Sequence, residues 1–240
     1  MSEPQQLTLK VQFRDGFRFE SFYVAPQAEN IEVFGILQNL SSIKVESQQL
    51  MLWGESQAGK THLLQACCAK EAASHSHSVV SYIPLKEVAS FGIEILNGLS
   101  FSRLIVLDDI DFVIGDKEWE TSLFNLINHC RASGQQLLMS STQNPRQLNC
   151  LLPDLASRLI WGGSYLIRAL NDEDKPKALQ ARAEQRGFKL TDRVIDYIYR
   201  RYPRDIESLM TLLDKLDKES LRQKAVITIP FVREVLKSLD

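Results

Sequence analysis

Cysteine is scarce in this chain, and the spacing of its four cysteines excludes the sites that cysteines usually build. Cys67 and Cys68 are adjacent, Cys130 and Cys150 stand alone, and no pair is separated by two residues. A disulfide framework and a structural zinc site both need a different arrangement. We therefore expect free thiols and a reducing compartment, which indicates a cytoplasmic protein.

Long apolar runs and an excess of basic charge are also missing. No stretch approaches the roughly 18 apolar residues that a membrane-spanning helix needs, and no apolar segment precedes Lys10 and Arg14. The formal net charge is −2, so nothing in the overall balance indicates a surface for nucleic acid or for a membrane. We expect a soluble protein without direct specific DNA binding.

A short glycine-rich segment is the most informative feature that is present. Gly54 and Gly59 stand five residues apart and are followed at once by Lys60 and Thr61. In a phosphate-binding loop the glycines permit tight turns, backbone N–H groups contact phosphates, the lysine adds a positive charge and the Thr hydroxyl can ligate Mg²⁺. The alternative is a glycine-rich turn with an idle lysine. The apolar segment 48–53 before the loop and the helical spacing after it favour the phosphate-binding loop.

The helix that starts at this loop points the positive end of its dipole at the same anion. We therefore predict that the chain binds ADP or ATP together with Mg²⁺. The residues expected to contact the nucleotide are those of the loop and the start of its helix: Gly54, Glu55, Ser56, Gln57, Ala58, Gly59, Lys60, Thr61 and His62.

An acidic pair follows an apolar segment farther along the chain. Asp108 and Asp109 come directly after 104–107, which has the composition of a buried parallel strand. A carboxylate there can hold Mg²⁺ through its water shell, and a second one can orient an attacking water. We assign Asp108 to the metal, with Thr61, and Asp109 to the water. The alternative is that both aspartates only cap the strand in a solvated turn.

Strands alternate with helices up to about residue 169, which predicts an α/β domain whose parallel sheet is covered by helices on both sides. A helix is expected at 117–132, with Gly134 as its stop signal, and Trp53, Trp119 and Trp161 are expected to pack in the core. The expected strands are 48–53, 79–83, 104–107, 136–140 and 165–167.

Beyond about residue 171 the pattern changes to helices without strands, which predicts a small all-α domain. A helix over 172–186 closes at Gly187, Thr191 caps a second, the Pro203 region opens a third and Pro230 starts a fourth. The expected domain boundaries are 1–16 for an N-terminal peptide and linker, 17–169 for the α/β domain and 170–240 for the helical domain.

Three further features could reach phosphate. The hydroxyls of Ser140, Ser141 and Thr142 end the fourth predicted strand, and Arg158 and Arg204 lie in later segments. Taken singly, such hydroxyls are more often turn formers and a lone arginine is more often a surface residue. The residues alone leave both interpretations open.

Taken together, these segments resemble the AAA+ ATPases, and within them the DnaA family. The resemblance rests on the loop with 61–66, on 107–110, on 153–159 and on the four-helix tail, and it covers about 17–239. It implies an AAA+ P-loop fold with a helical lid over the nucleotide. The roles that it implies are arginine finger for Arg158, lid arginine (sensor II) for Arg204, sensor I for Ser141 or Thr142, and proximity to the base for Tyr23.

The chain stops at Asp240, without the helix-turn-helix domain with which DnaA continues, and so resembles the DnaA-homologous regulators of initiation. The resemblance implies an N-terminal peptide that binds the sliding clamp, the β subunit of DNA polymerase III, through Gln6, Leu7 and Leu9. It also implies stimulation of ATP hydrolysis on the initiator DnaA, weak intrinsic hydrolysis and a homodimer as one assembly state.

Two other classes of protein remain open at this stage. A self-sufficient AAA+ ATPase that loads a helicase or remodels DNA would hydrolyse ATP rapidly by itself through Asp109. A DNA-binding regulator would show salt-dependent binding to DNA, and the charge balance of the chain counts against it.

Overall fold

A five-stranded parallel sheet forms the centre of the computed structural model, which describes residues 16–25, 29–40, 49–74 and 79–237. Across the sheet the strand order is β2-β3-β4-β1-β5, and each neighbouring pair is parallel. The strands predicted from the sequence are confirmed to within one residue at each end. They are β1 (Gln49–Trp53), β2 (Val80–Pro84), β3 (Leu104–Asp108), β4 (Gln136–Ser141) and β5 (Ser164–Leu166).

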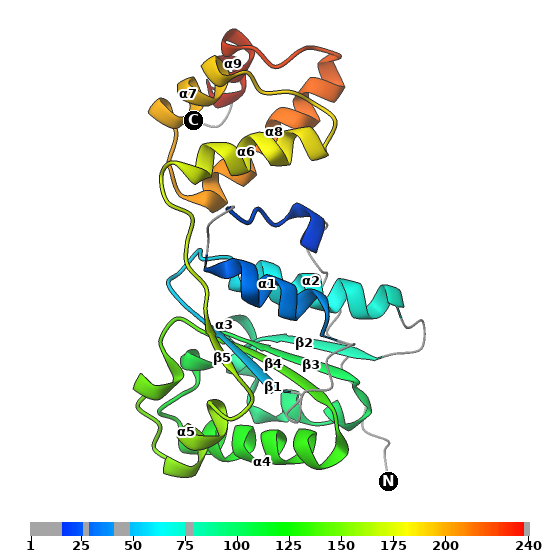
Figure 1. The fold of residues 1–240 in the computed structure, drawn as a ribbon, viewed down its shortest axis with the longest axis vertical. Coiled ribbons are helices and arrows are strands. Elements are labelled where there is room, and N and C mark those ends of the chain that lie inside the picture. The colour runs from blue at the N-terminus through cyan, green and yellow to red at the C-terminus, as the bar shows by residue number, and fades with distance from the viewer. Residues whose placement is uncertain (1–15, 26–28, 41–48, 75–78, 238–240) are drawn as a thin grey trace.

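Helices cover both faces of the sheet, as the near-continuous apolar strands predict (Figure 1). Along β3, Ile105 and Leu107 face one layer, and Leu104 and Val106 face the other, because successive side chains point to opposite sides of a strand. One layer contains α3 (Leu85–Val88), α4 (Lys117–Ser133) and α5 (Pro153–Leu159), and the other contains α1 (Asn30–Gln38) and α2 (Lys60–Ser74).

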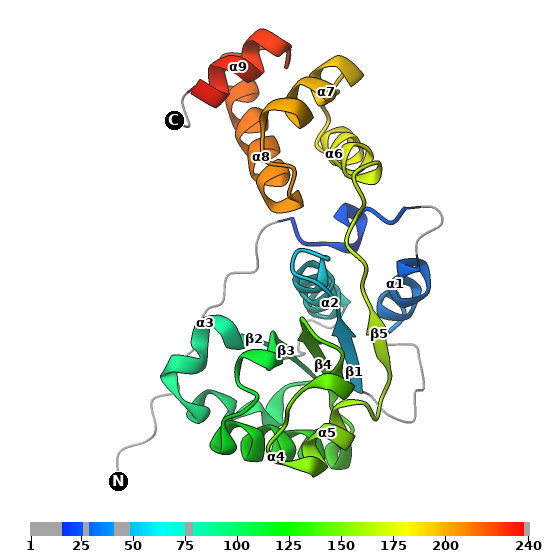
Figure 2. The same ribbon diagram turned by 90° about the vertical axis from the view of Figure 1, so that its left-hand side faces the viewer.

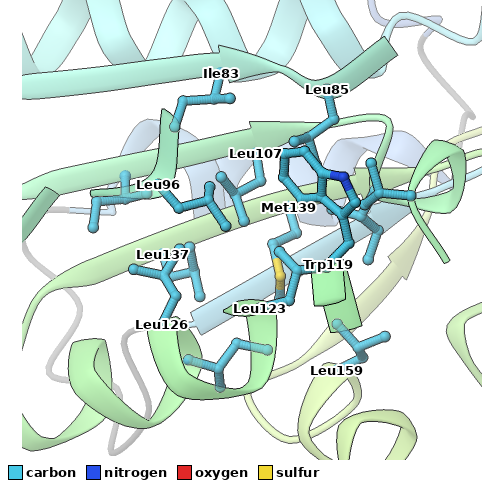
Figure 3. Close-up of a cluster of buried hydrophobic side chains, with 14 of the residues drawn as sticks. Ile83, Leu85, Leu96, Leu107, Trp119, Leu123, Leu126, Leu137, Met139 and Leu159 are labelled. Carbon is cyan, nitrogen blue, oxygen red and sulfur yellow. The ribbon is translucent and has the colours of Figure 1, made fainter. Parts of the chain in front are cut away.

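The layer that contains α4 packs on the sheet through a continuous apolar cluster. Figure 3 shows Trp119 and Leu123 of α4 pointing at Leu107 and Met139 of the sheet, with Leu159 of α5 at the edge of the cluster. Asp116 caps the start of α4 by accepting hydrogen bonds from the backbone N–H groups of Glu118 and Trp119 at 2.9 and 3.1 Å. Gly134, with a φ of 71°, ends the helix, so the prediction of 117–132 is confirmed.

Helix α1 was not predicted from the sequence. Its apolar residues are spread around most of its circumference, and Gly35 lies in its middle, so no clear helical stripe marks it. In the structure Val33 and Leu37, one turn apart, are the buried residues that pack beside α2. Short 3-10 helices connect the larger elements, at Phe19–Ser21, Ala89–Phe91, Ile93–Leu96, Leu99–Phe101, Ile110–Phe112 and Pro145–Gln147.

A separate bundle of helices follows the sheet domain, with a hydrophobic core built from its own residues. It contains α6 (Asp174–Gln185), α7 (Asp192–Arg201), α8 (Ile206–Gln223) and α9 (Ile229–Lys237), in agreement with the expected helical domain. Thr191 precedes α7, but its side chain makes no capping hydrogen bond. The side chain of Asp205 instead caps α8, accepting from the Ser208 N–H at 2.8 Å. Within the described parts of the chain, none of the helices has the length and apolar character needed to cross a bilayer.

The segment of residues 16–25 runs between the helical bundle and the layer formed by α1 and α2 (Figures 1 and 2). Arg182 of α6 donates a hydrogen bond to the Gly16 carbonyl at 3.1 Å, and Gln185 donates to the Glu20 carbonyl. The same segment contacts the start of α2 through His62. It therefore connects the helical bundle to the helix that follows the glycine-rich loop.

Glu120 fixes the position of α5 relative to α4. Its side chain is fully buried, and its two carboxylate oxygens accept hydrogen bonds from the backbone N–H groups of Gly115, Leu151 and Leu152 at 2.7–3.0 Å. Leu151 and Leu152 directly precede α5. One carboxylate thus joins the loop after β3 to the loop that leads into α5.

We expect replacement of Glu120 with alanine to lower the free energy of unfolding by about 3 kcal/mol, because three buried N–H groups would lose a charged acceptor. Urea denaturation of the variant and the wild type measures this difference. Glu118→Ala is the matched control, since Glu118 lies in the same first turn of α4 but is exposed. Equal stabilities of the Glu120 variant and the control would contradict the role assigned to this carboxylate.

Candidate nucleotide-binding site

The loop between β1 and α2 has a backbone shape that only its own residue types permit. Gly54 has a φ of 150°, and a Cβ atom there would lie 2.2 Å from the Ile167 carbonyl oxygen. Gly59 has a φ of 97°, and a Cβ atom there would lie 2.6 Å from the ring of Phe22. Gln57 also has a positive φ, 64°. Positive φ angles at positions 54, 57 and 59 turn the backbone tightly, as in the loops whose N–H groups form nests for phosphate anions.

Lys60 is buried at the start of α2, with 5 % of its surface exposed. Its Nζ atom donates hydrogen bonds to the carbonyls of Gly54 and Glu55 at 2.7 and 2.9 Å. Burial lowers the pKa of this amine, while the charges of Asp109, Asp108 and Asp111 act in the opposite direction. A cation enclosed by the loop and faced by carboxylates fits the role of a phosphate-binding lysine.

Asp108 is held by two hydroxyl groups from the neighbouring strands. Its Oδ2 atom accepts a hydrogen bond from the Tyr82 hydroxyl of β2 at 2.7 Å, and its Oδ1 atom accepts one from the Ser140 hydroxyl of β4. Ser140 also accepts a hydrogen bond from the Asp109 N–H at 2.8 Å. Burial, together with the neighbouring Asp108, raises the pKa of Tyr82. These contacts fix the direction in which the Asp108 carboxylate points.

The sequence alone indicates no role for Tyr82, and the family resemblance assigns sensor I to Ser141 or Thr142, one or two residues after Ser140. In the sequence, Ser140 is only one of three hydroxyls at a strand end. A signal for Tyr82 exists, because a tyrosine in a buried strand needs a hydrogen-bond partner for its hydroxyl. The identity of that partner depends on the pairing of β2 with β3.

Asp109 and Thr142 lie on the loops that follow β3 and β4. Asp109 adopts a left-handed backbone conformation, with φ 59° and ψ 54°. Burial, and after it the charges of Asp108 and Asp111, raises the pKa of the Asp109 carboxyl. Thr142 donates its hydroxyl to the Asp111 carboxylate, so Asp111 and Thr142 form a pair beside Asp109.

His62, the third residue of α2, contacts the N-terminal segment instead of the loop. One ring nitrogen lies 3.0 Å from the Arg18 carbonyl and 3.1 Å from the Ser21 hydroxyl, and the ring stacks on Phe17 at 4.6 Å. Burial lowers the pKa of His62, so its neutral form is favoured. Tyr23, expected near the base, is partly buried on the same segment.

The remaining loop residues differ in exposure. Glu55, Ser56 and Gln57 are exposed, Ala58 is buried, and Thr61 is partly exposed in the first turn of α2. No group of three or more His, Cys, Asp or Glu side chains in the described ranges is arranged to hold a metal ion by itself. The hydroxyl of Thr61 and the carboxylate of Asp108 are oxygen donors of the kind that Mg²⁺ takes in proteins, one or two at a time, while nucleotide phosphates and waters supply its other ligands.

Arg204, the lid arginine of the resemblance, lies on the surface of the helical bundle before α8. Its Nε atom donates to the Tyr199 carbonyl at 3.1 Å, and its guanidinium lies 5.0 Å from the centre of the Tyr199 ring. These contacts are with the bundle itself. Among the residues that the structure describes, no hydrogen bond joins Arg204 to the loop 54–61.

Arg158 lies at the opposite end of the sheet from the phosphate loop. Its carbonyl accepts a hydrogen bond at 2.7 Å from the side chain of Gln49, the first residue of β1, whereas the loop follows the last residue of that strand. Figure 2 shows β1 running toward the helical bundle, with α5 near the other end of the strand. The Arg158 guanidinium lies 4.6 Å from the centre of the Trp161 ring.

Trp119 is buried as predicted, but the prediction of core packing for Trp161 was wrong, because 42 % of its surface is exposed. It lies two residues after the end of α5, where Arg131 and Arg158 contact its ring. Gln6, Leu7 and Leu9, the expected clamp-binding residues, lie outside the described residues.

Comparison with protein families gives two matches that together span most of the chain. The model of the bacterial DnaA ATPase domain matches residues 13–165, and the model of the Hda lid domain matches residues 172–236. The boundary between the two matches falls where the sheet domain gives way to the helical bundle.

Solved structures share the same fold at low sequence identity. Domain III of the replication initiator DnaA from Thermotoga maritima has a TM-score of 0.74 and 21% identity, with 93% of this chain and 97% of that chain covered. AMPPCP-bound DnaA from Aquifex aeolicus has a TM-score of 0.67 and 24% identity, with 86% and 68% covered. A single-residue variant of RuvB from Thermotoga maritima has a TM-score of 0.64 and 15% identity, with 92% and 74% covered.

The similarity to these solved structures establishes the fold, and the matches to the two family models establish the protein family. A parallel sheet with a glycine-rich loop, an acidic pair and a helical lid is the AAA+ arrangement that the sequence predicted. The chain therefore belongs to the family of the bacterial DnaA ATPase domain, as an AAA+ protein whose helical domain is an Hda-type lid.

Proposed function

We propose that this protein is a nucleotide-bound regulator of replication initiation that binds the sliding clamp and stimulates ATP hydrolysis by the initiator DnaA. It would thereby convert DnaA from its ATP form to its ADP form and inactivate it in the cytoplasm. The match of the C-terminal domain to the Hda lid supports a partnership with DnaA. The N-terminal peptide with Gln6, Leu7 and Leu9 supports clamp binding, since glutamine and two apolar side chains suit a peptide-binding pocket.

The position of Arg158 is the observation that carries this proposal. Its main chain is tied to Gln49 at the amino end of β1, and Lys60 lies beyond the carboxyl end. Five residues of parallel strand span about 13 Å, so the two groups belong to different ends of the sheet. Arg158 is therefore poorly placed for the nucleotide of its own chain, which supports a role toward a nucleotide on a neighbouring molecule.

The chemistry that we propose for Arg158 is electrostatic. During phosphoryl transfer, negative charge spreads over the oxygens of the transferred group, and an arginine supplied by another molecule neutralises it. The guanidinium is partly exposed and lies against an indole ring, so it is accessible from solvent without a change of the backbone. Catalysis would then take place in the partner's site, with this protein as the activator.

The nucleotide of this chain itself, ADP or ATP, would be held by the loop 54–61, with Thr61 and Asp108 as the residues that would hold Mg²⁺. AMPPCP occupies the related DnaA of Aquifex aeolicus, which supports an adenine nucleotide here. The ion would neutralise phosphate charge when bound. We propose that intrinsic hydrolysis is weak, because Asp109, the residue assigned to the attacking water, is one methylene shorter than a glutamate and reaches less far toward that water.

We propose a separate function for each of the three parts of the chain, with the domain boundaries expected from the sequence. Residues 1–16 would recruit the clamp, 17–169 would hold the nucleotide and present Arg158, and 170–240 would close over the nucleotide as the lid, with Arg204 as its phosphate-sensing arginine. The contacts of Arg182 and Gln185 with the segment after the peptide support a mechanical link between these parts.

A hydrolysis assay tests the proposal as a whole. ATP-loaded DnaA is incubated with clamp on DNA, with and without this protein, and phosphate release is followed. We expect rapid release only when this protein is present and slow turnover by this protein alone. Rapid hydrolysis by the purified chain without partners, and no effect on DnaA, would instead favour a self-sufficient AAA+ loader.

We expect Gln6→Ala to reduce capture of this protein by immobilised sliding clamp at least about tenfold. In the proposed complex the Gln6 amide is buried in the peptide-binding pocket of the clamp, and its loss would leave a hydrogen-bonding group of that pocket unpaired. A pull-down at graded protein concentrations measures this change. Gln5→Ala is the matched control, since it removes the same side chain from the preceding position. Equal capture of both variants and the wild type would rule out the assigned role of Gln6.

A further inference from the structure

Two arginines from different helices lie against one exposed indole ring. The guanidinium carbon of Arg131, in the last turn of α4, lies 3.0 Å from the centre of the Trp161 ring. The guanidinium carbon of Arg158, in the last turn of α5, lies 4.6 Å from the same centre. These three residues form what we call the Arg131–Trp161–Arg158 cluster. Both cations therefore lie within the distance at which the face of an indole attracts them.

Within the part of the chain that the structure describes, no carboxylate is paired with either arginine of this cluster. Arg204, by comparison, lies over the Tyr199 ring but also near the Asp172 carboxylate. Two guanidinium groups with no carboxylate partner repel each other, and an anion that contacts both would relieve this repulsion.

The backbone beneath the cluster is rigidly placed. Gly162, next to Trp161, lies so close to β1 that a Cβ atom there would be 1.8 Å from the Gln49 carbonyl oxygen. The side chain of Gln49 also donates to the carbonyls of Arg158 and Leu159, and the Trp161 N–H donates to the Arg158 carbonyl at 3.3 Å. The backbone from which the Trp161 side chain extends is therefore held in place, and an aromatic side chain has few rotamers.

We propose that the Arg131–Trp161–Arg158 cluster is a preassembled polyphosphate-binding surface, in which Arg131 is a second cation for the nucleotide of the neighbouring subunit and Trp161 positions both arginines. The identity of the neighbour rests on the proposed function, whereas binding of a polyphosphate anion does not. Guanidinium groups suit this ligand because each presents a planar set of N–H donors to phosphate oxygens. The indole holds both guanidinium groups near its ring before any anion binds, so less conformational entropy is lost on binding.

The roles of the two arginines differ by position. Arg131 stacks more closely on the indole and is exposed, so it acts in binding and orientation of the anion. Arg158 lies farther from the ring and retains the freedom to turn toward the transferred phosphate. Loss of Arg131 therefore affects how tightly the partner is engaged, and loss of Arg158 affects how fast its nucleotide is hydrolysed.

A titration with inorganic tripolyphosphate tests anion binding without any partner. The protein used carries Lys60→Ala, which removes the positive charge of the phosphate loop. Binding is followed by tryptophan fluorescence. The same titration with the additional change Trp161→Phe shows which part of the fluorescence change comes from Trp161. We expect a saturable change in Trp161 fluorescence with a dissociation constant in about the millimolar range. Arg131→Gln should raise this dissociation constant about fivefold. Arg168→Gln should leave it unchanged, because Arg168 is an exposed arginine paired with Glu29. Identical titration curves with and without Arg131 would overturn the anion-binding surface.

The partner assay then separates this inference from the proposed function. With wild-type protein stimulating DnaA, Arg131→Gln should raise the concentration for half-maximal stimulation about fivefold and leave the maximal rate unchanged. Trp161→Ala should lower the maximal rate about tenfold, and Trp161→Phe should restore much of it, since another aromatic face is present. If stimulation by the wild type is normal and these variants match it, the cluster has no such role. If the wild type stimulates nothing, the proposed function fails, and the tripolyphosphate titration alone decides the inference.

Discussion

Replacing Arg158 with alanine is expected to lower the stimulation of ATP hydrolysis on DnaA by about a thousandfold or more. An arginine supplied to a neighbouring nucleotide contributes about 10³ to 10⁵ in rate in other nucleoside triphosphatases, because it neutralises charge that exists only in the transition state. Alanine cannot reach the phosphate, and Arg131, fixed on the same indole, stays on α4 and cannot replace it. Phosphate release by ATP-loaded DnaA under single-turnover conditions measures the effect.

The variant should remain folded and should still bind the clamp. It loses one stacking contact with Trp161, which is worth about 1 kcal/mol at a partly exposed site, while the hydrogen bond from Gln49 to the main chain at position 158 is kept. Arg146→Ala is the control, because Arg146 is an exposed arginine on the short helix before α5. Full stimulation by the Arg158 variant, with normal clamp capture, would refute the arginine-finger assignment.

The parts of this site that the sequence predicts are those whose residues are contiguous. The loop from Gly54 to Thr61 is a local motif, and its strand and helix follow from apolar patterns on either side. The acidic pair at Asp108 is predicted for the same reason, since it directly follows a buried strand. The order of strands and helices along the chain then determines the α/β class.

Contacts between distant segments could not be predicted in this way. The Asp108 carboxylate is held by Tyr82 and Ser140, which are 26 and 32 residues away, and these contacts depend on strand order and register. Thr142 follows the same strand as Ser140, but its hydroxyl meets Asp111 on the next loop. Ser140 and Ser141 point to opposite faces of β4, and Thr142 lies beyond the end of that strand, so a hydroxyl triplet in the sequence does not reveal which member faces the site.

Surface positions were the least predictable. Trp161 was expected in the core from its residue type alone, and its exposure follows from the tertiary position of α5. His62 belongs to the helix of the phosphate loop by sequence, but the segment of residues 16–25 folds over its ring. For His62 the local pattern predicts the correct helix, whereas no helix directly before Trp161 is predicted from the sequence. For both side chains, residues far away in the sequence decide what the side chain contacts.

The second large effect is expected at the phosphate loop. Replacing Lys60 with alanine should weaken binding of ADP and ATP at least a hundredfold, because the variant loses a charge-assisted hydrogen bond inside a partly desolvated site. It also leaves Asp108 and Asp109 facing the phosphates without the cation that offsets their charge. Isothermal calorimetry with each nucleotide, in the presence of Mg²⁺, measures the dissociation constants.

Lys86→Ala separates a specific contact from a general loss of positive charge. Lys86 is an exposed lysine whose charge, like that of Lys60, lowers the pKa of Asp109, yet it lies outside the loop. If affinity depended only on the local potential, both variants would weaken nucleotide binding to a similar degree. Because Lys60 donates to the Gly54 and Glu55 carbonyls from inside the nest, we expect only its loss to abolish the stabilisation by saturating ADP in thermal unfolding. A Lys60 variant that binds ADP as tightly as the wild type would contradict the assignment of the loop 54–61 as the nucleotide-binding site of this chain.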